Sequence, residues 1–380
     1  MELRTPCYII DEKKLIENGE ILKGVQDRTG CKILLAQKAF SNYDVYPLLS
    51  QYLAGTEASG LFEARLGKEE MPEKECHVFC AAYREDEFDE LLNYADHIVF
   101  NSVRQLSMFA DKAKKAGKEI GLRINPEHST QEGHEIYDPC SKTSRLGVTR
   151  KEFDRQMTPD LLEKLDGIHF HTLCEQNSDD LATTLDAVIQ KFDDVLFKMK
   201  WVNMGGGHHI TREDYDVDLL EKCIKKVVDK YNVTVYLEPG EAVALNAGYL
   251  KTTVLDIVAN TDNNIAILDM SAACHTPDVI EMPYLPPLQN AVKEGNGKND
   301  YILAGPTCLA GDVVGTYGFD NPLNIGDILT FEDMAIYSMC KNNTFNGMPL
   351  PSIYLQKENG EYETIASFDY YDFKYRLGRK

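Results

Sequence analysis

The sequence predicts a (β/α)8 barrel followed by an all-β domain, and three observations carry this prediction. Eight short β-rich runs alternate with helical patterns over the first two-thirds of the 380 residues. The runs are almost continuously apolar, as strands buried in a parallel sheet are. After about residue 250 the helical patterns give way to strand-like runs separated by turn residues. A doubly wound open sheet is the competing fold, but it normally shows a glycine fingerprint after its first strand, and none follows this one.

The barrel elements can be assigned in order along the chain. The eight predicted strands are 32–36, 55–59, 77–80, 97–100, 120–125, 167–171, 201–204 and 233–238. Helical patterns lie between them. In the last of these, Leu220, Ile224, Val227 and Tyr231 recur at helical spacing with charged residues opposite. The segment 179–200 shows the same pattern, so each strand is expected to be followed by a helix that covers the barrel.

The second domain is predicted from strands alone. They are 249–260, 264–270, 301–305, 327–331, 352–356 and 363–367. The stretch "TPCYIID" (5–11) is strand-like and precedes the first barrel helix, so we expect it to join this domain. The predicted division is therefore a barrel at 12–250 and a β-sandwich or barrel-like domain at 251–380 that includes 1–11.

Composition excludes several classes of protein. The net charge of −21 disfavours nucleic acid and anionic membrane surfaces as partners. No apolar run approaches the roughly 20 residues that span a bilayer, and "MELRTPCYII" lacks the architecture of a signal peptide. Ten cysteines without metal-type pairing indicate reduced thiols and a cytoplasmic location. His208 and His209 have no further ligands at metal spacing, so no metal site is expected.

Four chemically distinctive segments fall where predicted barrel strands end, the edge at which barrel enzymes place their active sites. Lys38 follows the first strand, and His169 and His171 end the sixth. "MGGGHH" (204–209) follows the seventh strand and "EPGEA" (238–242) the eighth. A lysine at the end of a buried strand costs several kcal/mol unless its charge is used or removed. We therefore expect Lys38 to have a chemical role.

These segments together describe one kind of ligand. Consecutive glycines let backbone N–H groups approach an anion, above all a phosphate. A deprotonated lysine forms a Schiff base with an aldehyde. His171 can stack on a flat ring, and Glu238 can hold a proton on a ring nitrogen. A phosphate, an aldehyde and a planar ring with a basic nitrogen are the parts of pyridoxal 5′-phosphate, which we predict as the cofactor.

The same residues carry a resemblance to a known family. Lys38 in "LLAQKAFS", His171 in "GIHFHTLCEQ", "MGGG", "EPG", "GPTC" (305–308) and "DMAIYSMCKNNTFNG" (333–347) occur in order. They resemble the pyridoxal-phosphate-dependent decarboxylases of the alanine-racemase fold, whose members include ornithine and diaminopimelate decarboxylases. The resemblance covers nearly the whole chain. Within the family, "HFHTLCEQ", "EPGEAVALNAG", "LDMSAACHTPDVIEMPY" and "GPTCLAGD" are most similar to the carboxynorspermidine decarboxylases.

The resemblance implies a role for each matching residue. Lys38 would form the Schiff base with the cofactor, His171 would stack on its ring, and Glu238 would pair with its pyridine nitrogen. The residues implied in the phosphate site are Gly206, Gly207, Gly240 and Tyr337, with Arg123 near the cofactor. Cys308 resembles the cysteine that reaches in from the other subunit of a homodimer and protonates the product. A carboxylate at the ring nitrogen keeps it protonated, which strengthens the electron sink that decarboxylation requires.

Two departures from the relatives indicate the substrate. Ornithine decarboxylase has an arginine shortly after its "EPG", where this chain has Glu241. Diaminopimelate decarboxylase has an arginine in the loop that resembles "DVIEMPY", where this chain has Glu281. Both changes reverse the sign of the pocket and suit a substrate whose far end carries ammonium groups. Asp278 and Asp312 are further candidate acceptors, and His275 is a candidate hydrogen-bonding wall.

We therefore expect a homodimeric carboxy-lyase of polyamine synthesis that converts carboxynorspermidine or carboxyspermidine to norspermidine or spermidine. The alternative is a pyridoxal-phosphate-dependent decarboxylase of ornithine, lysine or meso-diaminopimelate. A third class, inactive relatives that bind regulatory partners, is disfavoured because Lys38, Glu238 and Cys308 are all present.

Overall fold

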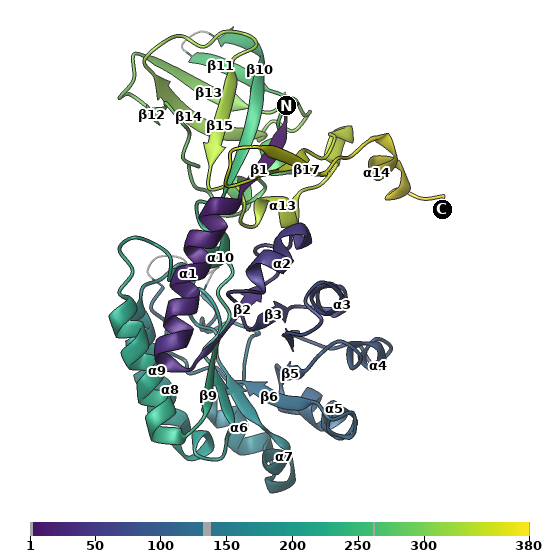
Figure 1. Cartoon of the computed structure of the whole chain (residues 1–380), viewed down its shortest axis with the longest axis vertical. Helices are drawn as coiled ribbons and strands as arrows, with labels where there is room; N and C mark the ends of the chain where they lie inside the picture. The colour runs from purple at the N-terminus through teal and green to yellow at the C-terminus, as the bar shows by residue number, and fades with distance from the viewer. Residues whose placement is uncertain (1–2, 132–137, 261–262, 380) are drawn as a thin grey trace. The chain divides into compact units, whose positions relative to one another are not determined.

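A computed structural model describes residues 3–131, 138–260 and 263–379 of the chain (Figure 1). The chain divides into two compact units. One comprises Ile16–Val243, and the other comprises Met1–Leu15 with Ala244–Lys380. The sequence prediction placed the divisions at residues 12 and 250.

The first unit is a closed barrel of eight parallel strands, which confirms the predicted fold class. Its strands are β2 (Lys32–Ala36), β3 (Gly55–Ala58), β4 (Glu75–Phe79), β5 (His97–Phe100), β6 (Glu119–Arg123), β7 (Gly167–His169), β8 (Trp201–Asn203) and β9 (Thr234–Leu237). Each strand pairs with the next in sequence, and pairing of β9 with β2 closes the barrel.

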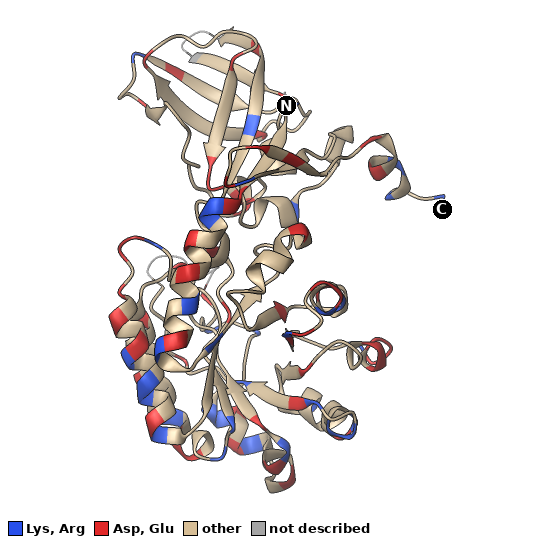
Figure 2. Cartoon of the chain, in the orientation of Figure 1, with Lys and Arg blue, Asp and Glu red and all other residues tan. Residues whose placement is uncertain are grey.

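Helices follow the strands on the outside of the barrel (Figure 1). They are α1 (Glu12–Thr29), α2 (Tyr46–Leu49), α3 (Leu61–Glu70), α4 (Phe88–Leu91), α5 (Val103–Lys115), α6 (Arg150–Gln156), α7 (Pro159–Lys164), α8 (Ser178–Leu196), α9 (Val217–Tyr231) and α10 (Glu241–Ala244). Figure 2 shows charged residues spread over α1, α8 and α9, while the barrel strands are largely uncharged. In α9 the Asp216 side chain caps the N-terminus, and Leu220, Ile224 and Val227 are buried.

The barrel interior near the strand N-termini is filled by one large ring. Trp201 at the start of β8 is buried, and Gly121 and Gly167 on the two preceding strands leave room for it. A Cβ atom at Gly121 or Gly167 would lie 2.3 or 2.0 Å from the indole ring, which real structures do not tolerate. These glycines are therefore packing residues.

The second unit contains a nine-stranded mixed sheet in the order β12-β14-β13-β11-β10-β1-β16-β17, with β15 also pairing with β10. Its strands are β1 (Cys7–Asp11), β10 (Gly248–Asn260), β11 (Asn263–Leu268), β12 (Val292–Lys293), β13 (Asn299–Ala304), β14 (Val313–Phe319), β15 (Ile328–Glu332), β16 (Ser352–Gln356) and β17 (Tyr362–Ala366). As expected, the N-terminal strand belongs here, between β10 and β16. A bulge between Val254 and Asp256 divides β10 into a part that pairs with β1 and β15 and a part that pairs with β11.

The sequence prediction omitted β12, β14 and the short helices of this unit. These helices are α11 (Ala272–His275), α12 (Asp278–Glu281), α13 (Ser338–Lys341) and α14 (Tyr370–Tyr375). Within the described residues, none of the helices has both the length and the apolar character needed to cross a bilayer.

Candidate active site

The structure brings the predicted barrel residues to the same end of the barrel. Parallel strands direct their C-terminal ends to one rim, and β2, β7, β8 and β9 end at Ala36, His169, Asn203 and Leu237. Lys38 and Glu238 follow two of these strands directly. His171 lies in the loop after β7, because that strand ends two residues earlier than predicted.

Lys38 forms a buried ion pair that the sequence did not predict. Its Nζ lies 3.1 Å from Oε2 of Glu57 on β3, and the Glu57 side chain is only 2% exposed. The Lys38 side chain is 35% exposed, so it remains accessible on the rim. Burial opposes the Lys38 charge, yet Glu57 and Glu238 raise the pKa of its ammonium above the ordinary value. Burial raises the pKa of Glu57 to about 7 despite the adjacent ammonium, so this carboxyl can exchange a proton near neutral pH.

Glu238 is held by two hydrogen-bond donors on neighbouring strands. His169 Nε2 lies 3.0 Å from Oε2, and the Asn203 amide donates to Oε1 at 2.5 Å. Burial lowers the pKa of His169, so its ring is the neutral donor of this bond. Burial alone would raise the pKa of Glu238, but the bond from His169 and the Lys38 charge bring it down to about 2. The rim therefore presents a fixed, ionised carboxylate.

One hydrogen bond holds the His171 ring, and a second holds its backbone carbonyl. The Gly206 N–H donates to His171 Nδ1 at 3.2 Å, which leaves the proton on Nε2. The Arg123 guanidinium donates to the His171 carbonyl at 3.0 Å and lies 4.6 Å from the centroid of Phe79. Burial lowers the pKa of His171 well below the ordinary value, so the ring is neutral. A neutral, fixed imidazole suits stacking on a flat ligand.

Two glycine loops at this rim carry unused backbone donors. In the described part of the chain, no group accepts a hydrogen bond from the N–H of Gly207 or of Gly240. The Gly206 N–H, in contrast, is used by His171. A Cβ atom at Gly207 would lie 2.1 Å from the Leu173 carbonyl oxygen, and Gly207 has φ +80°, so only glycine fits there.

These observations fit the predicted cofactor. The accessible amine of Lys38 suits an aldehyde, and the free amides of Gly207 and Gly240 suit a phosphate. The ionised Glu238 suits a protonated ring nitrogen, and the His171 ring suits the face of a pyridine. The amide of Gly206, a further residue of the predicted phosphate site, donates to His171 in this structure.

Glu241 and His209 form a second carboxylate–imidazole pair on the rim. His209 Nε2 lies 2.8 Å from Glu241 Oε2, and both side chains are largely buried. Glu241, predicted to bind substrate, is thus engaged with the loop after β8.

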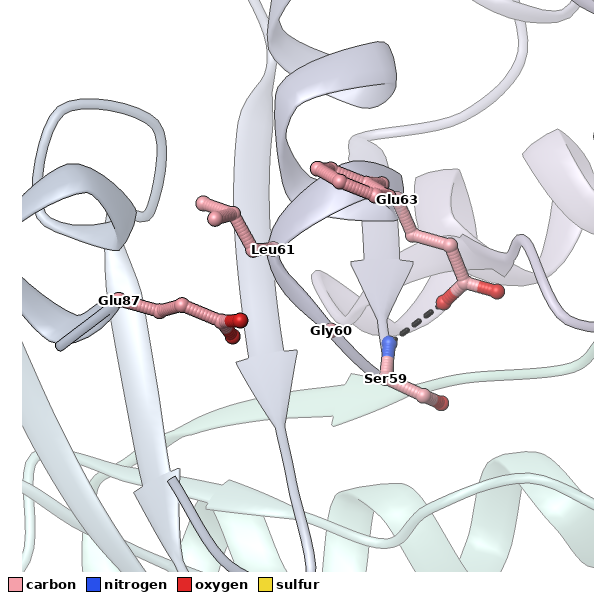
Figure 3. Close-up of a pocket in the computed structure, with 6 residues that line it drawn as sticks. Ser59, Gly60, Leu61, Glu63 and Glu87 are labelled. Carbon is pink, nitrogen blue, oxygen red and sulfur yellow. Dashed lines mark hydrogen bonds between the residues drawn. The ribbon is translucent and has the colours of Figure 1, made fainter. Parts of the chain in front are cut away.

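A cavity of about 320 Å³ lies where β3 leads into α3. No motif in the sequence predicted a cavity at this place. Figure 3 shows Glu63 and Glu87 beside the Ser59–Leu61 turn. Glu63 accepts the Ser59 N–H at 2.6 Å, and Glu87 pairs with Arg84 at 3.0 Å. Since both carboxylates have partners, we assign no ligand to this cavity.

Most predicted substrate residues of the second unit have partners within that unit. Asp312 is 2% exposed, and its two oxygens accept from the hydroxyls of Ser271 and Thr307 at 2.9 and 2.6 Å. His275 is buried: its Nε2 lies 3.0 Å from the Pro349 carbonyl and its Nδ1 accepts the Ser271 N–H. Asp312 thus ties the loop that carries Cys308 to the start of α11.

The other predicted site residues of the second unit are more exposed to solvent. Asp278 and Glu281 both bind the Lys341 ammonium, the latter at 2.9 Å, which leaves the group with one net negative charge. Cys308 is exposed on its turn. Tyr337 has φ +55°, a conformation that costs of order 1–3 kcal/mol for a non-glycine residue and clusters at functional sites.

Glu57 and Asn203 are the site residues that the sequence analysis missed. Glu57 stands in the predicted strand "GTEAS", where an acidic residue in a buried strand is itself a signal, as it is for Lys38. Asn203 gave no signal, because only the folded barrel shows that its amide faces Glu238.

Comparisons with known proteins match nearly the whole chain. The family model described as "Pyridoxal-dependent decarboxylase, C-terminal sheet domain" matches residues 7–335. A carboxynorspermidine/carboxyspermidine decarboxylase of Campylobacter jejuni is 43% identical, over 99% of both chains. A carboxyaminopropylagmatine decarboxylase of Synechocystis is 38% identical, over 99% of this chain and 96% of the relative.

Solved structures give the same result. The crystal structure of Campylobacter jejuni carboxynorspermidine decarboxylase complexed with norspermidine superposes with a TM-score of 0.90 at 41% identity, covering 98% of this chain and 100% of that one. Diaminopimelate decarboxylase from M. jannaschii, at 21% identity and a TM-score of 0.81, shares the fold, covering 100% of this chain and 93% of that one.

Proposed function

Because the chain belongs to the pyridoxal-dependent decarboxylase family, we propose that it decarboxylates carboxynorspermidine or carboxyspermidine to norspermidine or spermidine. The observation that carries the proposal is the accessible Lys38 amine on the same rim as the ionised Glu238. A decarboxylase needs an amine to bind the cofactor aldehyde and a carboxylate to hold the ring proton. The alternative substrates ornithine, lysine and diaminopimelate are less favoured, because diaminopimelate decarboxylases reach only 24% identity.

Each rim residue has a defined part in this chemistry. Pyridoxal 5′-phosphate, when bound, supplies the electron sink for the pair of electrons that loss of CO2 leaves behind. Lys38 would hold the cofactor through its aldehyde group. Glu238 would keep a proton on the ring nitrogen, and His171 would pack on the ring face. Glu57 lies 3.1 Å from Lys38 Nζ and holds the lysine side chain in place, because its negative charge favours the ammonium form.

The phosphate is assigned to the free amides of Gly207 and Gly240 together with Tyr337, with Arg123 fixing His171. Cys308 is assigned to the second subunit of a homodimer, where its thiol protonates the product carbon. Its exposure on a turn supports this assignment, since the thiol is open to a partner. None of the ten cysteines forms a disulfide bond, which supports a reducing compartment, the cytoplasm.

The distal ammonium groups of the substrate are assigned to Asp278 and Glu281. These two carboxylates flank the Lys341 ammonium, and an acidic group of this kind suits the ammonium groups of the substrate. Asp312 and His275 instead hold the loop before Cys308, because their polar atoms are engaged inside the unit. Glu241 is assigned to the contact with His209 and not to the substrate.

A turnover panel tests the proposed substrate. Carboxynorspermidine, carboxyspermidine, carboxyaminopropylagmatine, ornithine, lysine and meso-diaminopimelate are compared by kcat/KM. We expect the first two to exceed the diamino acids by at least about 100-fold, since a lost charge-assisted contact is worth roughly 1.5–3 kcal/mol and two are at stake. Preference for diaminopimelate would refute the assignment of Glu281.

Subunit mixing tests the shared site. Lys38→Ala and Cys308→Ala should each be strongly impaired alone, the second by about 100-fold or more, as loss of a general acid is. When the two variants are mixed and allowed to exchange subunits, one composite site should regain both residues and part of the activity. Cys340→Ala, which alters the other exposed cysteine, is the control and should remain active. Failure of the mixture to recover activity would argue that Cys308 acts within its own chain.

A further inference from the structure

Lys341 lies where two acidic side chains and an aromatic ring meet. Its ammonium binds the carboxylates of Asp278 and Glu281, the latter at 2.9 Å, and lies 5.5 Å from the centroid of the Tyr337 ring. The two carboxylates come from the first and last residues of α12, and the ammonium comes from the last residue of α13. Carboxylates and an aromatic face are groups that bind alkylammonium ions, and here the ion is a side chain of the protein.

This ion cluster is open to solvent on one side. The Asp278 side chain is 14% exposed, whereas those of Lys341 and Glu281 are 36% and 58% exposed. Burial opposes the Lys341 charge, but the hydrogen bonds to both carboxylates outweigh it and raise the pKa of the ammonium. Lys341 is therefore a cation that solvent reaches. Because water and salt screen ion pairs of this kind, a second cation that enters from solvent can replace it.

A substrate ammonium at this site competes with Lys341. The proposed function assigns Asp278 and Glu281 to the distal ammonium groups of the substrate, and the present inference rests on that assignment. An ammonium placed beside Lys341 would be repelled by it at short range. An ammonium that displaces Lys341 exchanges one cation for another and leaves both carboxylates paired. A distal carboxylate allows no such exchange, because it would add a third negative charge to Asp278 and Glu281.

We infer that Lys341 is a specificity-determining residue: its ammonium occupies the distal ammonium site of the empty enzyme and is displaced only by a substrate that carries a cation of its own. Lys341 then lowers the affinity for a cationic substrate, because only the fraction of protein with the site vacated binds the distal end. A lysine that merely tied α12 to α13 would have the opposite effect, since its loss would loosen the site and weaken binding.

Binding of two amines to the protein loaded with pyridoxal 5′-phosphate tests the inference. One is norspermidine, the product of the proposed reaction, and the other is N-propyl-1,3-diaminopropane, which lacks one terminal amine. Binding is followed by the change in cofactor absorbance when a primary amine reaches the aldehyde, so the propyl end of the second amine is directed to the distal site. Lys341→Met should tighten binding of norspermidine by roughly 10-fold, the effect of one charge-assisted contact, and binding of the second amine by less than about 3-fold.

Two further variants of Lys341 separate its charge from its structural contacts. Lys341→Arg keeps a cation at the carboxylates and should bind norspermidine about as tightly as the wild type. Lys341→Gln keeps a hydrogen-bond donor for Asp278 without the charge, so α12 stays tied to α13, and it should show the same gain as Lys341→Met.

Lys357 provides the matched control. It also lies between two carboxylates, 3.4 Å from Glu12 and 3.3 Å from Glu363, and the proposed function gives neither of them a part in binding. Lys357→Met makes the same change in net charge and should leave the affinity for norspermidine unchanged. Unchanged or weaker norspermidine binding in the Met and Gln variants of Lys341, an equal gain for both amines, or an equal gain in Lys357→Met would overturn the inference and leave the proposed function standing. If the loaded wild-type protein did not bind norspermidine, the proposed function itself would fail.

Discussion

The barrel has a cluster of lysine, glutamate and histidine at each of its ends, and the two clusters are built differently. At the floor, where the strands begin, the Lys32 ammonium and His77 Nε2 both bind Glu75, the histidine at 3.0 Å. His77 stacks on His97 with ring centroids 3.9 Å apart, and Tyr236 lies 4.5 Å from His77. At the floor, the charged groups satisfy one another.

At the rim the same residue types are kept apart. Glu238 is bound to His169 and Asn203, while Lys38 has Glu57 as its carboxylate partner and stays 35% exposed. The Glu57 carboxyl has a pKa raised to about 7 by burial, and the Glu75 carboxyl has a pKa well below the ordinary value, because bonds from His77 and Lys32 outweigh its burial. The comparison shows that the reactivity of a lysine, glutamate or histidine in the barrel depends on which groups it pairs with. Its presence in a buried barrel is not sufficient.

The spacing of the acidic and histidine side chains at the floor would by itself suggest a metal site. Ligand atoms of Glu75, His77 and His97 all lie within 4.8 Å of one another. However, the two imidazole planes are only 16° from parallel, so their in-plane lone pairs do not converge on one point, and Lys32 already neutralises Glu75. The floor is a packing cluster in which the cation is an ammonium.

The largest expected contrast in activity is between Lys38, which follows β2, and Lys32, the first residue of β2. Lys38→Met should abolish decarboxylation, with a loss of more than about 1,000-fold, because the cofactor loses its covalent attachment. Lys32→Met should leave kcat nearly unchanged and lower the free energy of unfolding by about 1–3 kcal/mol, because Glu75 loses a partner. Both quantities are measured on both variants, by steady-state turnover and by urea unfolding. Comparable activity loss in the two variants would remove the distinction between rim and floor.

The two glutamates give the next contrast. Glu57→Gln should lower the pKa of the Lys38 ammonium, because the carboxylate that raises it is lost, and should shift the pH dependence of cofactor capture by about 1–3 pH units toward lower pH. Glu75→Gln should leave the pH profile unchanged and cost about 1–3 kcal/mol of stability. The rate of imine formation is followed by absorbance from pH 6 to pH 8. A wild-type profile in Glu57→Gln would exclude Glu57 as the group that raises the pKa of Lys38.

The smallest effect is on stability in acid. Burial, and then the neighbouring His77, lower the pKa of His97 from 6.5 to about 2. Below pH 6.5 the imidazole of His97 binds a proton in the unfolded chain but not in the folded chain. The contribution of neutral His97 to the free energy of unfolding is therefore complete above pH 6.5 and is lost as the pH falls. At about 1.4 kcal/mol per pH unit, wild type should lose roughly 2–3 kcal/mol through His97 between pH 6.5 and 4.5. His97→Gln should lack this part of the slope, whereas His128→Gln, in the loop after β6, should keep it. Equal slopes in both variants would show that His97 is not a source of acid sensitivity.

The comparison also shows what the sequence can predict. The eight strands and the positions of Lys38 and Glu238 follow from apolar runs and from the rule that parallel strands end at one rim. Strand β14 was missed because Gly315 and Gly318 interrupt its apolar pattern. The partners of acidic residues could not be predicted, because they come from distant parts of the chain.

Asp312 illustrates this limit. Its carboxylate resembles a substrate acceptor in the sequence, and only the fold brings Ser271 and Thr307 to its two oxygens. Glu57 illustrates a related case, because its place in a buried strand signals a role, but only the fold shows that its partner is Lys38. Pairing across the barrel is information that a single sequence does not contain.

The central claim is that Lys38, which follows β2, carries the cofactor and that Lys32, the first residue of β2, does not. Purified protein loaded with pyridoxal 5′-phosphate is reduced with borohydride, digested and analysed by mass spectrometry. We predict one phosphopyridoxyl adduct, on the peptide containing Lys38, with Lys32 unmodified. An adduct on a different lysine, or a loaded protein with no trappable adduct, would contradict this account of the barrel.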